Sequence, residues 1–345
     1  MDEILKIKDL RVSFPTESGI LRAVRGIDLS LGRGEVLAVV GESGSGKSVS
    51  TRAVLGILPR GAIVESGEIV YGGRDLLTLG EREMVRIRGR RIAMVPQDPF
   101  TSLDPISTVG EQITEVMQSG GGRRGRAMRR ERAIKLLREV GIPEPERRFH
   151  EYPFRLSGGM RQRVAIAAGL AADPEILICD EPTTALDVTI EAQILDLLME
   201  LKRTRGLSML FITHDLGVVA RIADRVAVMY AGRVVECGSV EDVFYDPRHP
   251  YTWALLSSVP TGDGSRLEAI RGAVPDMRHP PRADAFALRS DYALRIDMLI
   301  DPPTFTVREG HTVSSWLCHK DAPKIEPPRA VRERIERYRK YGRES

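Results

Sequence analysis

The chain has 345 residues, which at a loose ~150 residues per domain predicts about two domains and argues against a single small binding module. Hydrophobic residues make up 42% and charged residues 29%, the balance of an ordinary globular protein rather than of a disordered or fibrous chain. The 51 Lys and Arg residues against 48 Asp and Glu leave a net charge of +3, too small for wholesale electrostatic binding of nucleic acid.

Neither a membrane span nor a disulfide framework is expected. The longest run without Asp, Glu, Lys or Arg, residues 249–262, is shorter than the ~18–20 apolar residues that cross a bilayer. The acidic start of the chain shows no signal peptide, and the alternation at residues 6–8 resembles an edge strand. Three scattered cysteines, Cys179, Cys237 and Cys318, fit a reducing cytoplasm.

Short apolar runs rich in β-branched residues predict parallel strands that are buried on both faces. These runs are residues 36–40, 92–95, 176–179 and 209–213. Between the last two, residues 189–205 repeat apolar side chains at helical spacing, which predicts a helix with one buried stripe. Strands that alternate with helices indicate an α/β fold.

Two further segments stand out by composition. Residues 121–140 are strongly basic and predict a surface helix, whose charges favour a solvated face or a protein partner over a nucleic-acid patch. From residue 247 proline becomes frequent, which predicts a compact appendix of short elements. The charged tail at residues 329–343 reads as a helix or as a frayed end.

The first pattern that carries chemistry follows the strand predicted at residues 36–40. Residues 41–48 read Gly-Glu-Ser-Gly-Ser-Gly-Lys-Ser, a full match to the phosphate-binding loop pattern. Glycines let the backbone curl so that successive N–H groups face phosphate oxygens, and the following helix adds its positive end. We expect Lys47 to reach the β- and γ-phosphates and the Ser48 hydroxyl to bind Mg²⁺. The nucleotide-binding residues predicted here are Gly41, Ser43, Gly44, Ser45, Gly46, Lys47, Ser48 and Val49.

The second pattern is a pair of carboxylates at the end of the strand predicted at residues 176–179. Adjacent acids repel each other, which is unfavourable as structure but suits a site that holds a cation and a water molecule. We expect Asp180 to hold Mg²⁺ through water and Glu181 to accept the proton of the attacking water. The alternative is an acid pair at the surface without a chemical role.

Further motifs give the chain a family resemblance. Residues 156–163, Leu-Ser-Gly-Gly-Met-Arg-Gln-Arg, look like the signature segment of ABC-transporter ATPases, with Met160 where the commonest form has Gln. The other matches, in chain order, are Phe14 for the aromatic residue that stacks on adenine, Gln97 for the loop glutamine, Asp187 for the dimer-interface loop and His214 for the switch histidine. The resemblance covers about residues 4–260. Without it, Phe14 reads equally well as a core strand residue.

The resemblance implies a fold and a mechanism. The fold is a P-loop ABC ATPase with a RecA-like core, an antiparallel β subdomain and a helical subdomain at about residues 98–172, all within residues 1–250. Two ATP molecules are clamped between two such domains, so the single phosphate loop and signature of this chain require a second subunit. The implied catalytic residues are Glu181, His214 and Gln97; the Mg²⁺ ligands are Ser48, Gln97 and Asp180; and the signature residues that act in trans are Ser157, Gly158, Gly159 and Met160.

Residues 251–345 are expected to form a C-terminal extension. The segment at 249–260, which begins His-Pro-Tyr, is similar to the extension of dipeptide and oligopeptide importer ATPases. Without this resemblance, its apolar residues predict only a helix that packs on the ATPase domain. That group commonly holds an iron–sulfur cluster on four cysteines, and alignment puts Asp284, Ser290, Asp297 and Ser315 at these positions. Because oxygen atoms are poor substitutes for thiolates, we expect no cluster. We expect the two acids to be solvated at the surface rather than to hold a hard cation.

The sequence therefore predicts the ATP-hydrolysing subunit of a dipeptide or oligopeptide importer, peripheral to the cytoplasmic face of the cell membrane. The implied partners are a second ABC ATPase that is a related but different chain, two transmembrane permease subunits and, indirectly, an extracellular solute-binding protein; nucleic acid is not expected. The alternatives are the same motor in an oligosaccharide or nickel importer, and a soluble ABC ATPase that acts on nucleic acid or ribosomes.

Overall fold

The computed structural model describes residues 2–117, 122–184, 186–259 and 270–341. The chain forms two compact units, which are described in turn. The first unit comprises residues 1–2, 32–35 and 78–212, and the second comprises residues 3–31, 36–77 and 213–345. The expected division at residue 250 separates the ATPase domain, here called the motor, from the C-terminal extension, here called the appendix. It rests on sequence motifs and does not coincide with these two units, so it stays a prediction.

The first unit contains parallel strands in the order β8 (Ser208–Thr213), β7 (Ile176–Asp180) and β6 (Ile92–Val95). Every residue of β7 is buried, as a continuous apolar run predicts for a strand covered on both faces. Helix α8 (Val188–Arg205) follows β7 and buries its apolar stripe of Ile194, Leu197, Leu198 and Leu201. The strands and the helix expected in this unit are confirmed to within one residue at each end.

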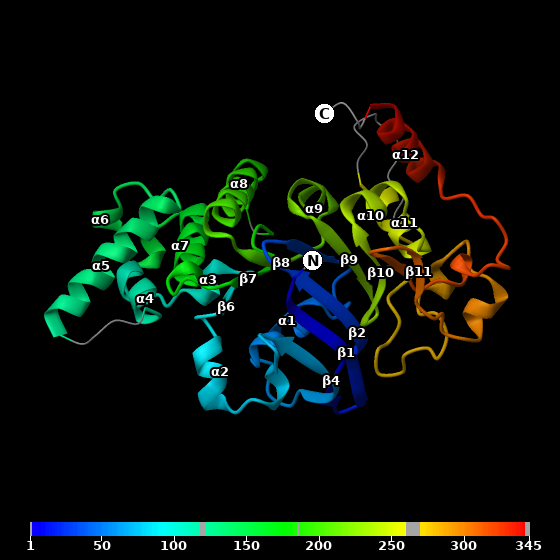
Figure 1. Cartoon of the computed structure of the whole chain (residues 1–345), viewed down its shortest axis with the longest axis horizontal. Helices are drawn as coiled ribbons and strands as arrows, with labels where there is room; N and C mark the ends of the chain where they lie inside the picture. The colour runs from blue at the N-terminus through cyan, green and yellow to red at the C-terminus, as the bar shows by residue number, and fades with distance from the viewer. Residues whose placement is uncertain (1, 118–121, 185, 260–269, 342–345) are drawn as a thin grey trace. The chain divides into compact units, whose positions relative to one another are not determined.

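Helices fill the stretch between β6 and β7, as expected for a helical subdomain, and the helices from α4 (Val109–Glu115) to α7 (Gly158–Leu170) lie together (Figure 1). The helices of the first unit that precede α8 are α2 (Glu81–Ile87), α3 (Pro99–Ser102), α4 (Val109–Glu115), α5 (Gly122–Glu139), α6 (Pro145–Arg148), the 3₁₀ turn η2 (Pro153–Arg155) and α7 (Gly158–Leu170). Helix α4 begins with a capping box, in which Thr108 accepts a hydrogen bond from the Glu111 backbone and the Glu111 carboxylate accepts one from Thr108.

The basic segment forms α5, whose two faces differ. Ala133, Leu136 and Leu137 are buried against the unit, while most of the arginines are exposed. Arg132 pairs with Asp173, and Arg138 lies 2.6 Å from a carboxylate oxygen of Glu146. This arrangement favours a solvated helix face.

The second unit contains an antiparallel sheet in the order β2 (Gly19–Gly32), β1 (Glu3–Thr16), β4 (Ile63–Tyr71) and β5 (Arg74–Asp75). This is the expected antiparallel β subdomain. The expectation of an edge strand at residues 6–8 was wrong, because β1 has a neighbouring strand on each side. The alternation of Lys6, Ile7 and Lys8 instead reflects the two faces of the sheet: Ile7 is buried and Lys8 exposed.

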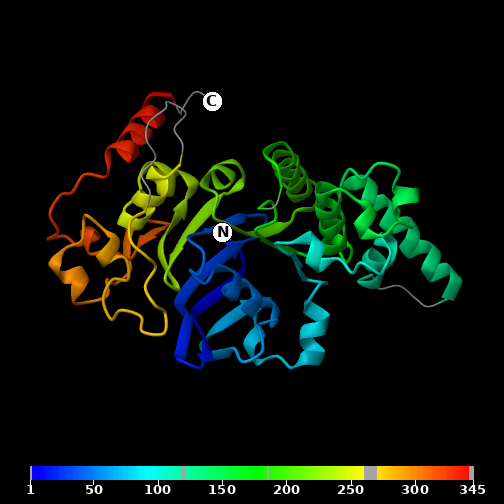
Figure 2. The same ribbon diagram turned by 180° about the vertical axis from the view of Figure 1, so that it is seen from behind.

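The second unit also contains strands in the order β11 (Phe305–Arg308), β12 (His311–Val313), β10 (Arg233–Ser239), β9 (Arg225–Tyr230) and β3 (Val36–Val40). Strands β3 and β9 are parallel, whereas β12 is antiparallel to β10. The expected appendix therefore extends a sheet that begins in the motor. Figure 2 shows from behind that its short elements, in orange, lie beside α10 (Val240–Tyr245) and α11 (Pro250–Ser257). The remaining elements of the unit are α1 (Lys47–Leu55), η1 (Leu76–Thr78), α9 (Leu216–Ile222), α10 (Val240–Tyr245), α11 (Pro250–Ser257), η3 (Ala287–Arg289), η4 (Arg295–Met298), η5 (Trp316–Cys318) and α12 (Arg329–Tyr341).

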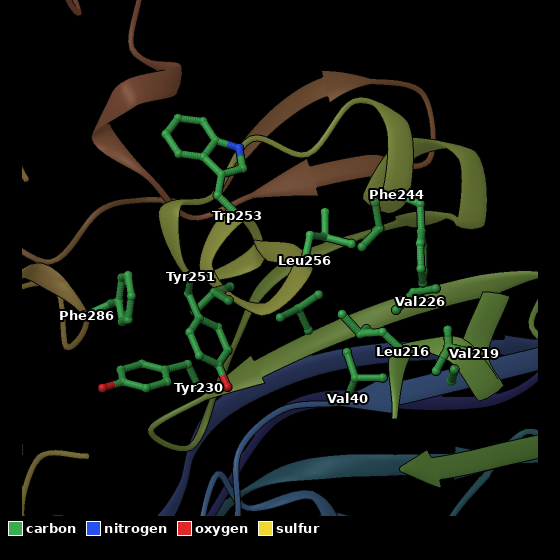
Figure 3. Packing of buried hydrophobic residues seen from close by; sticks show 14 of the residues in the cluster. Val40, Leu216, Val219, Val226, Tyr230, Phe244, Tyr251, Trp253, Leu256 and Phe286 are labelled. Atoms are coloured by element: carbon green, nitrogen blue, oxygen red, sulfur yellow. The ribbon is translucent and has the colours of Figure 1, made fainter. Parts of the chain in front are cut away.

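One hydrophobic core joins the motor and the appendix within the second unit (Figure 3). Its members include Val40, Val226, Val228, Tyr230, Phe244, Tyr251, Trp253, Leu256, Met277, Phe286 and Val331. Full burial of a large apolar side chain contributes about 1.5–3 kcal/mol, so the appendix is anchored by several such contributions. Helix α12 continues this packing: the ring of Tyr338 stacks on that of Tyr245 with centroids 3.6 Å apart. Within the described part of the chain, no helix has the length and apolar character that a membrane span requires.

Candidate functional site

The phosphate-binding loop lies in the second unit, between β3 and α1. Its glycines take left-handed backbone angles, with φ of +80° at Gly44 and +99° at Gly46. Gly46 is the N-terminal cap of α1 and supplies no side chain to the N–H groups of the first turn. A helix start with open N–H groups and a positive dipole end suits an anion.

The loop lies so close to the surrounding backbone that side chains are excluded at two of its positions. A Cβ atom on Gly41 would stand 2.1 Å from the Met229 carbonyl oxygen, and one on Gly46 would stand 2.5 Å from that of Ala23. Both distances are shorter than any real contact of a Cβ atom. Glycine is therefore required at these positions by space as well as by conformation.

The predicted cation of the loop is Lys47, whose side chain is buried. Its Nζ donates hydrogen bonds to the carbonyl oxygens of Gly41 at 2.7 Å and Glu42 at 3.0 Å. The ammonium group thus lies over the loop, while Ser48 and Val49 are partly buried at the start of α1. A curled glycine backbone, an open helix start and a buried lysine fit the phosphates of a nucleotide, and the Ser48 hydroxyl is a suitable oxygen ligand for Mg²⁺.

The acid pair lies in the first unit at the end of β7. Asp180 is 1% exposed, and burial raises the pKa of the neighbouring Cys179 thiol to about 12, with a further contribution from the Asp180 charge. Glu181 has φ of +48°, a left-handed angle that is uncommon outside glycine, and its N–H donates to the Ile212 carbonyl at 2.9 Å. Backbone strain of this kind is concentrated at functional sites.

The structure brings Gln97 and Glu181 together. The Gln97 amide donates to a Glu181 carboxylate oxygen at 3.1 Å, and the Thr184 hydroxyl donates to the same oxygen at 3.0 Å. Thr184 was not predicted from the sequence. The available signal was its position three residues after Glu181, from which a hydroxyl can reach the Glu181 carboxylate across one turn. Two donors fix the orientation of the carboxylate that we expect to act as the base.

The signature segment forms the start of α7. The Ser157 hydroxyl caps this helix by accepting a hydrogen bond from the Met160 N–H, and Ser157 is itself exposed. Asp187 caps α8 in the same way, accepting from the Ile190 N–H at 2.9 Å. A Cβ atom on Gly159 would meet Ile190 at 2.7 Å, so Gly159 allows α7 and α8 to pack closely. Of the dimer-interface loop, Ala185 lies outside the described residues.

The other predicted residues lie in the second unit. Phe14 is half-buried in β1, and His214 is exposed in the loop between β8 and α9. Asp215 holds the backbone next to His214, since its carboxylate accepts hydrogen bonds from Gly217 and Val218 at the start of α9. The predicted site residues are thus divided between the units: the phosphate loop, Phe14 and His214 belong to the second unit and the others to the first.

Comparison with known proteins decides the family. A profile described as ABC transporter matches residues 24–184, and one described as Oligopeptide/dipeptide transporter, C-terminal region matches residues 235–296. The chain is 54% identical over 336 residues to the oligopeptide transport ATP-binding protein OppD of Bacillus subtilis (strain 168), which covers 96% of this chain and 94% of the relative. The chain belongs to the ATP-binding proteins of ABC transporters. Within this family it is also 49% identical over 339 residues to the dipeptide transport ATP-binding protein DppD of Lactococcus lactis subsp. cremoris (strain MG1363), covering 98% and 97% of the two chains.

Solved structures of the ABC family confirm the fold. The dimeric structure of MJ0796, a bacterial ABC transporter cassette, matches with a TM-score of 0.61 and 29% identity, covering 68% of this chain and 98% of that one. A dimeric post-hydrolysis state of the same cassette bound to ADP and Pi matches with a TM-score of 0.61 and 28% identity over the same shares. The P-loop ABC ATPase fold expected from the sequence is therefore confirmed.

The four positions aligned with cluster cysteines carry side chains that serve the local backbone. Each accepts a hydrogen bond from a nearby N–H: Asp284 from Phe286, Ser290 from Tyr292, Asp297 from Leu294 and Ser315 from Leu317. The expectation of two solvated surface acids was wrong for Asp297, which is 3% exposed, and burial raises the pKa of both Asp297 and Asp284. Within the described ranges, no three His, Cys, Asp or Glu side chains come together as metal ligands. These oxygen atoms do not fit an iron–sulfur cluster.

The glycines of the phosphate loop give a first prediction. Gly46→Ala should lower the free energy of unfolding by more than Gly44→Ala. Both glycines have a left-handed angle, but a Cβ atom at position 46 also meets a backbone oxygen, whereas one at position 44 meets nothing within 4 Å. We expect about 1–2 kcal/mol for the angle alone at Gly44 and a further ~1–3 kcal/mol for overpacking at Gly46. Urea unfolding of the two variants measures the difference, and equal losses would contradict the close approach.

The oxygen side chains of the appendix give a second prediction. Protein purified without oxygen should contain neither stoichiometric iron nor acid-labile sulfide, because Asp284, Ser290, Asp297 and Ser315 offer no thiolate. Iron and sulfide assays measure this, with a four-cysteine member of the group purified in parallel as the positive control. Stoichiometric iron with sulfide in this chain would overturn the prediction.

Proposed function

We propose that the chain is the ATP-binding and ATP-hydrolysing subunit that powers an ABC importer for dipeptides or oligopeptides. The observation that carries this proposal is 54% identity over nearly the whole length of an oligopeptide transport ATP-binding protein. The peptide-transport names of the relatives, together with the match to an oligopeptide/dipeptide transporter C-terminal region, favour peptides over oligosaccharides, nickel or a soluble role on nucleic acid.

ATP binding is assigned to the phosphate loop and the start of α1. Lys47 and the loop N–H groups are expected to hold the phosphates, and Phe14 to stack on adenine. Ser48, Gln97 and Asp180 carry the oxygen atoms suited to Mg²⁺, which supplies positive charge against the phosphates when it is bound. The curled backbone and the buried ammonium group of Lys47 support this assignment.

Hydrolysis is assigned to Glu181. Its carboxylate accepts a proton from the attacking water, so that the new O–P bond forms as the bond to the leaving ADP breaks. Gln97 and Thr184 are the donors that hold this carboxylate in place, which supports its role as an oriented base. His214 is proposed as a hydrogen-bond partner of the γ-phosphate.

The signature segment at the start of α7 supports pairing with a second ATPase subunit. Ser157 is an exposed cap at the start of a thirteen-residue helix, an arrangement suited to the phosphate of a nucleotide held by another chain. Met160 and the two glycines Gly158 and Gly159 complete this surface, and Asp187 caps the adjoining helix. The dimeric structures of the MJ0796 cassette support pairing, and we propose that the partner here is a related but different chain.

The remaining partners follow from the family. We propose two transmembrane permease subunits, and indirectly an extracellular solute-binding protein, with the chain peripheral to the cytoplasmic face of the cell membrane. The name of the relative, an oligopeptide transport ATP-binding protein, supports this assembly. Nucleic acid is not among the proposed partners.

The role of Glu181 gives a third prediction. Glu181→Gln should retain ATP binding but lower turnover by about 100-fold or more, because the amide keeps the shape of the side chain and removes the proton acceptor. Steady-state ATPase assays and equilibrium ATP binding measure the two properties. Glu200→Gln on the exposed face of α8 is the matched control and should turn over normally. Near-normal turnover of the Glu181 variant would show that another group is the base.

The assembly gives a fourth prediction. Affinity-tagged full-length chain, extracted from the membranes of its own host with a mild detergent, should copurify with hydrophobic permease subunits and a second ABC ATPase. Mass spectrometry of the eluate identifies these components. A stable soluble complex with nucleic acid or ribosomes instead would contradict the proposed function.

A further inference from the structure

An arginine from the C-terminal appendix forms an ion pair with the phosphate-binding loop. Arg289 lies in η3, and its side chain is only 6% exposed. Its guanidinium donates two parallel hydrogen bonds to the carboxylate of Glu42, the second residue of the loop, at 2.6 Å and 3.0 Å. This two-pronged geometry is the strongest form of arginine–carboxylate pairing.

The guanidinium of Arg289 is held in place from several sides. Its Nε donates to the Arg271 carbonyl at 2.7 Å, and a further N–H donates to the Tyr230 hydroxyl at 3.1 Å. Its Cζ atom lies 5.6 Å from the ring centroid of Tyr230 and 5.8 Å from that of Phe286. The pairing with Glu42 raises the pKa of Arg289, so the group is a permanent cation in this position.

A second contact from the appendix reaches the same loop residue. The Glu42 N–H donates a hydrogen bond to the Tyr251 hydroxyl at 2.8 Å, and burial raises the pKa of Tyr251, so this hydroxyl stays neutral. The Glu42 carbonyl accepts from Lys47, the residue expected to bind phosphate. Glu42 is therefore fixed at its side chain by Arg289, at its N–H by Tyr251 and at its carbonyl by Lys47.

The charge of Glu42 gives this arrangement a consequence for ATP binding. A carboxylate in a loop that binds a triphosphate repels the ligand, whereas a carboxylate paired with a buried cation is neutralised. The phosphate loop alone does not supply this cation, because the Lys47 ammonium bonds the loop carbonyls. The cation comes from a residue 247 positions further along the chain.

We propose that Arg289 is a positioning residue for ATP: the appendix neutralises Glu42 through Arg289 and thereby sets the affinity of the phosphate loop for nucleotide. The proposal rests on ATP binding as proposed above. It gives the appendix a role in nucleotide binding that needs no metal cluster. Arg289 acts through Glu42 and is not assigned any contact with ATP.

The test compares equilibrium binding of Mg·ATP and Mg·ADP to full-length chain by isothermal titration calorimetry, in buffers of low and high salt. The variants are Arg289→Gln, Glu42→Gln and the double variant, with circular dichroism to confirm folding. Arg278→Gln is the matched control, because it removes an appendix arginine that pairs with exposed Asp276 rather than with the loop.

Arg289→Gln should weaken ATP binding about tenfold, weaken ADP binding less and lose part of its effect at high salt, because the unpaired Glu42 charge repels phosphate. Glu42→Gln should bind ATP as well as the parent chain or more tightly, and the double variant should match Glu42→Gln within about twofold. Arg278→Gln should bind normally.

Three results would overturn the proposal. ATP affinity of Arg289→Gln within twofold of the parent would show that the pair does not influence the loop. A double variant as weak as Arg289→Gln would show that the arginine only supports the fold. A tenfold loss in Glu42→Gln alone, which tests the idea even if Arg289→Gln does not fold, would show that the carboxylate itself is needed. Failure of the parent chain to bind ATP would instead contradict the proposed function.

Discussion

The packing of Tyr230, Tyr251 and Phe286 against one another determines the position of the phosphate loop. Their ring centroids lie 4.6–5.3 Å apart. Tyr230 ends β9, whereas Tyr251 in α11 and Phe286 before η3 both belong to the appendix. The end of β9 in turn bounds the loop, because the Met229 carbonyl leaves no room for a side chain at Gly41. The turn that follows β9 also supports the loop, since the Gly232 N–H donates to the Ser45 carbonyl at 3.1 Å. The phosphate loop and the appendix therefore both pack on the end of β9.

Features that depend on neighbouring residues could be predicted from the sequence. The strands at residues 36–40 and 92–95 are continuous apolar runs, and the phosphate loop and acid pair are local patterns, so their place in the fold followed directly. The family and its importer branch also followed from motifs in a fixed order. The contact between Gln97 and Glu181 joins residues 84 positions apart and could be expected only from the resemblance.

Features that depend on long-range packing could not be predicted. The pair of Arg289 and Glu42 has no local signal, because neither a glutamate in a loop nor an arginine in a short helical turn is unusual. The burial of Asp297 was missed because carboxylates are normally solvated, and only the structure shows the N–H group of Leu294 that compensates it. The position of β1 between two other strands could not be predicted either. The alternation of polar and apolar residues indicates which face of a strand is buried, but not which strands lie beside it.

The pairing of β12 with β10 limits where the polypeptide can be truncated without exposing a sheet edge. Glu236 lies opposite Val313 and Cys237 opposite Thr312, so the appendix satisfies backbone donors and acceptors of a motor strand. A polypeptide cut at residue 250 would leave β10 as an open sheet edge, a surface prone to pairing with other chains. The segment at residues 305–313 thus covers the edge that β10 would otherwise leave open. A relative without this segment needs another element to pair with the backbone N–H and C=O groups of that strand.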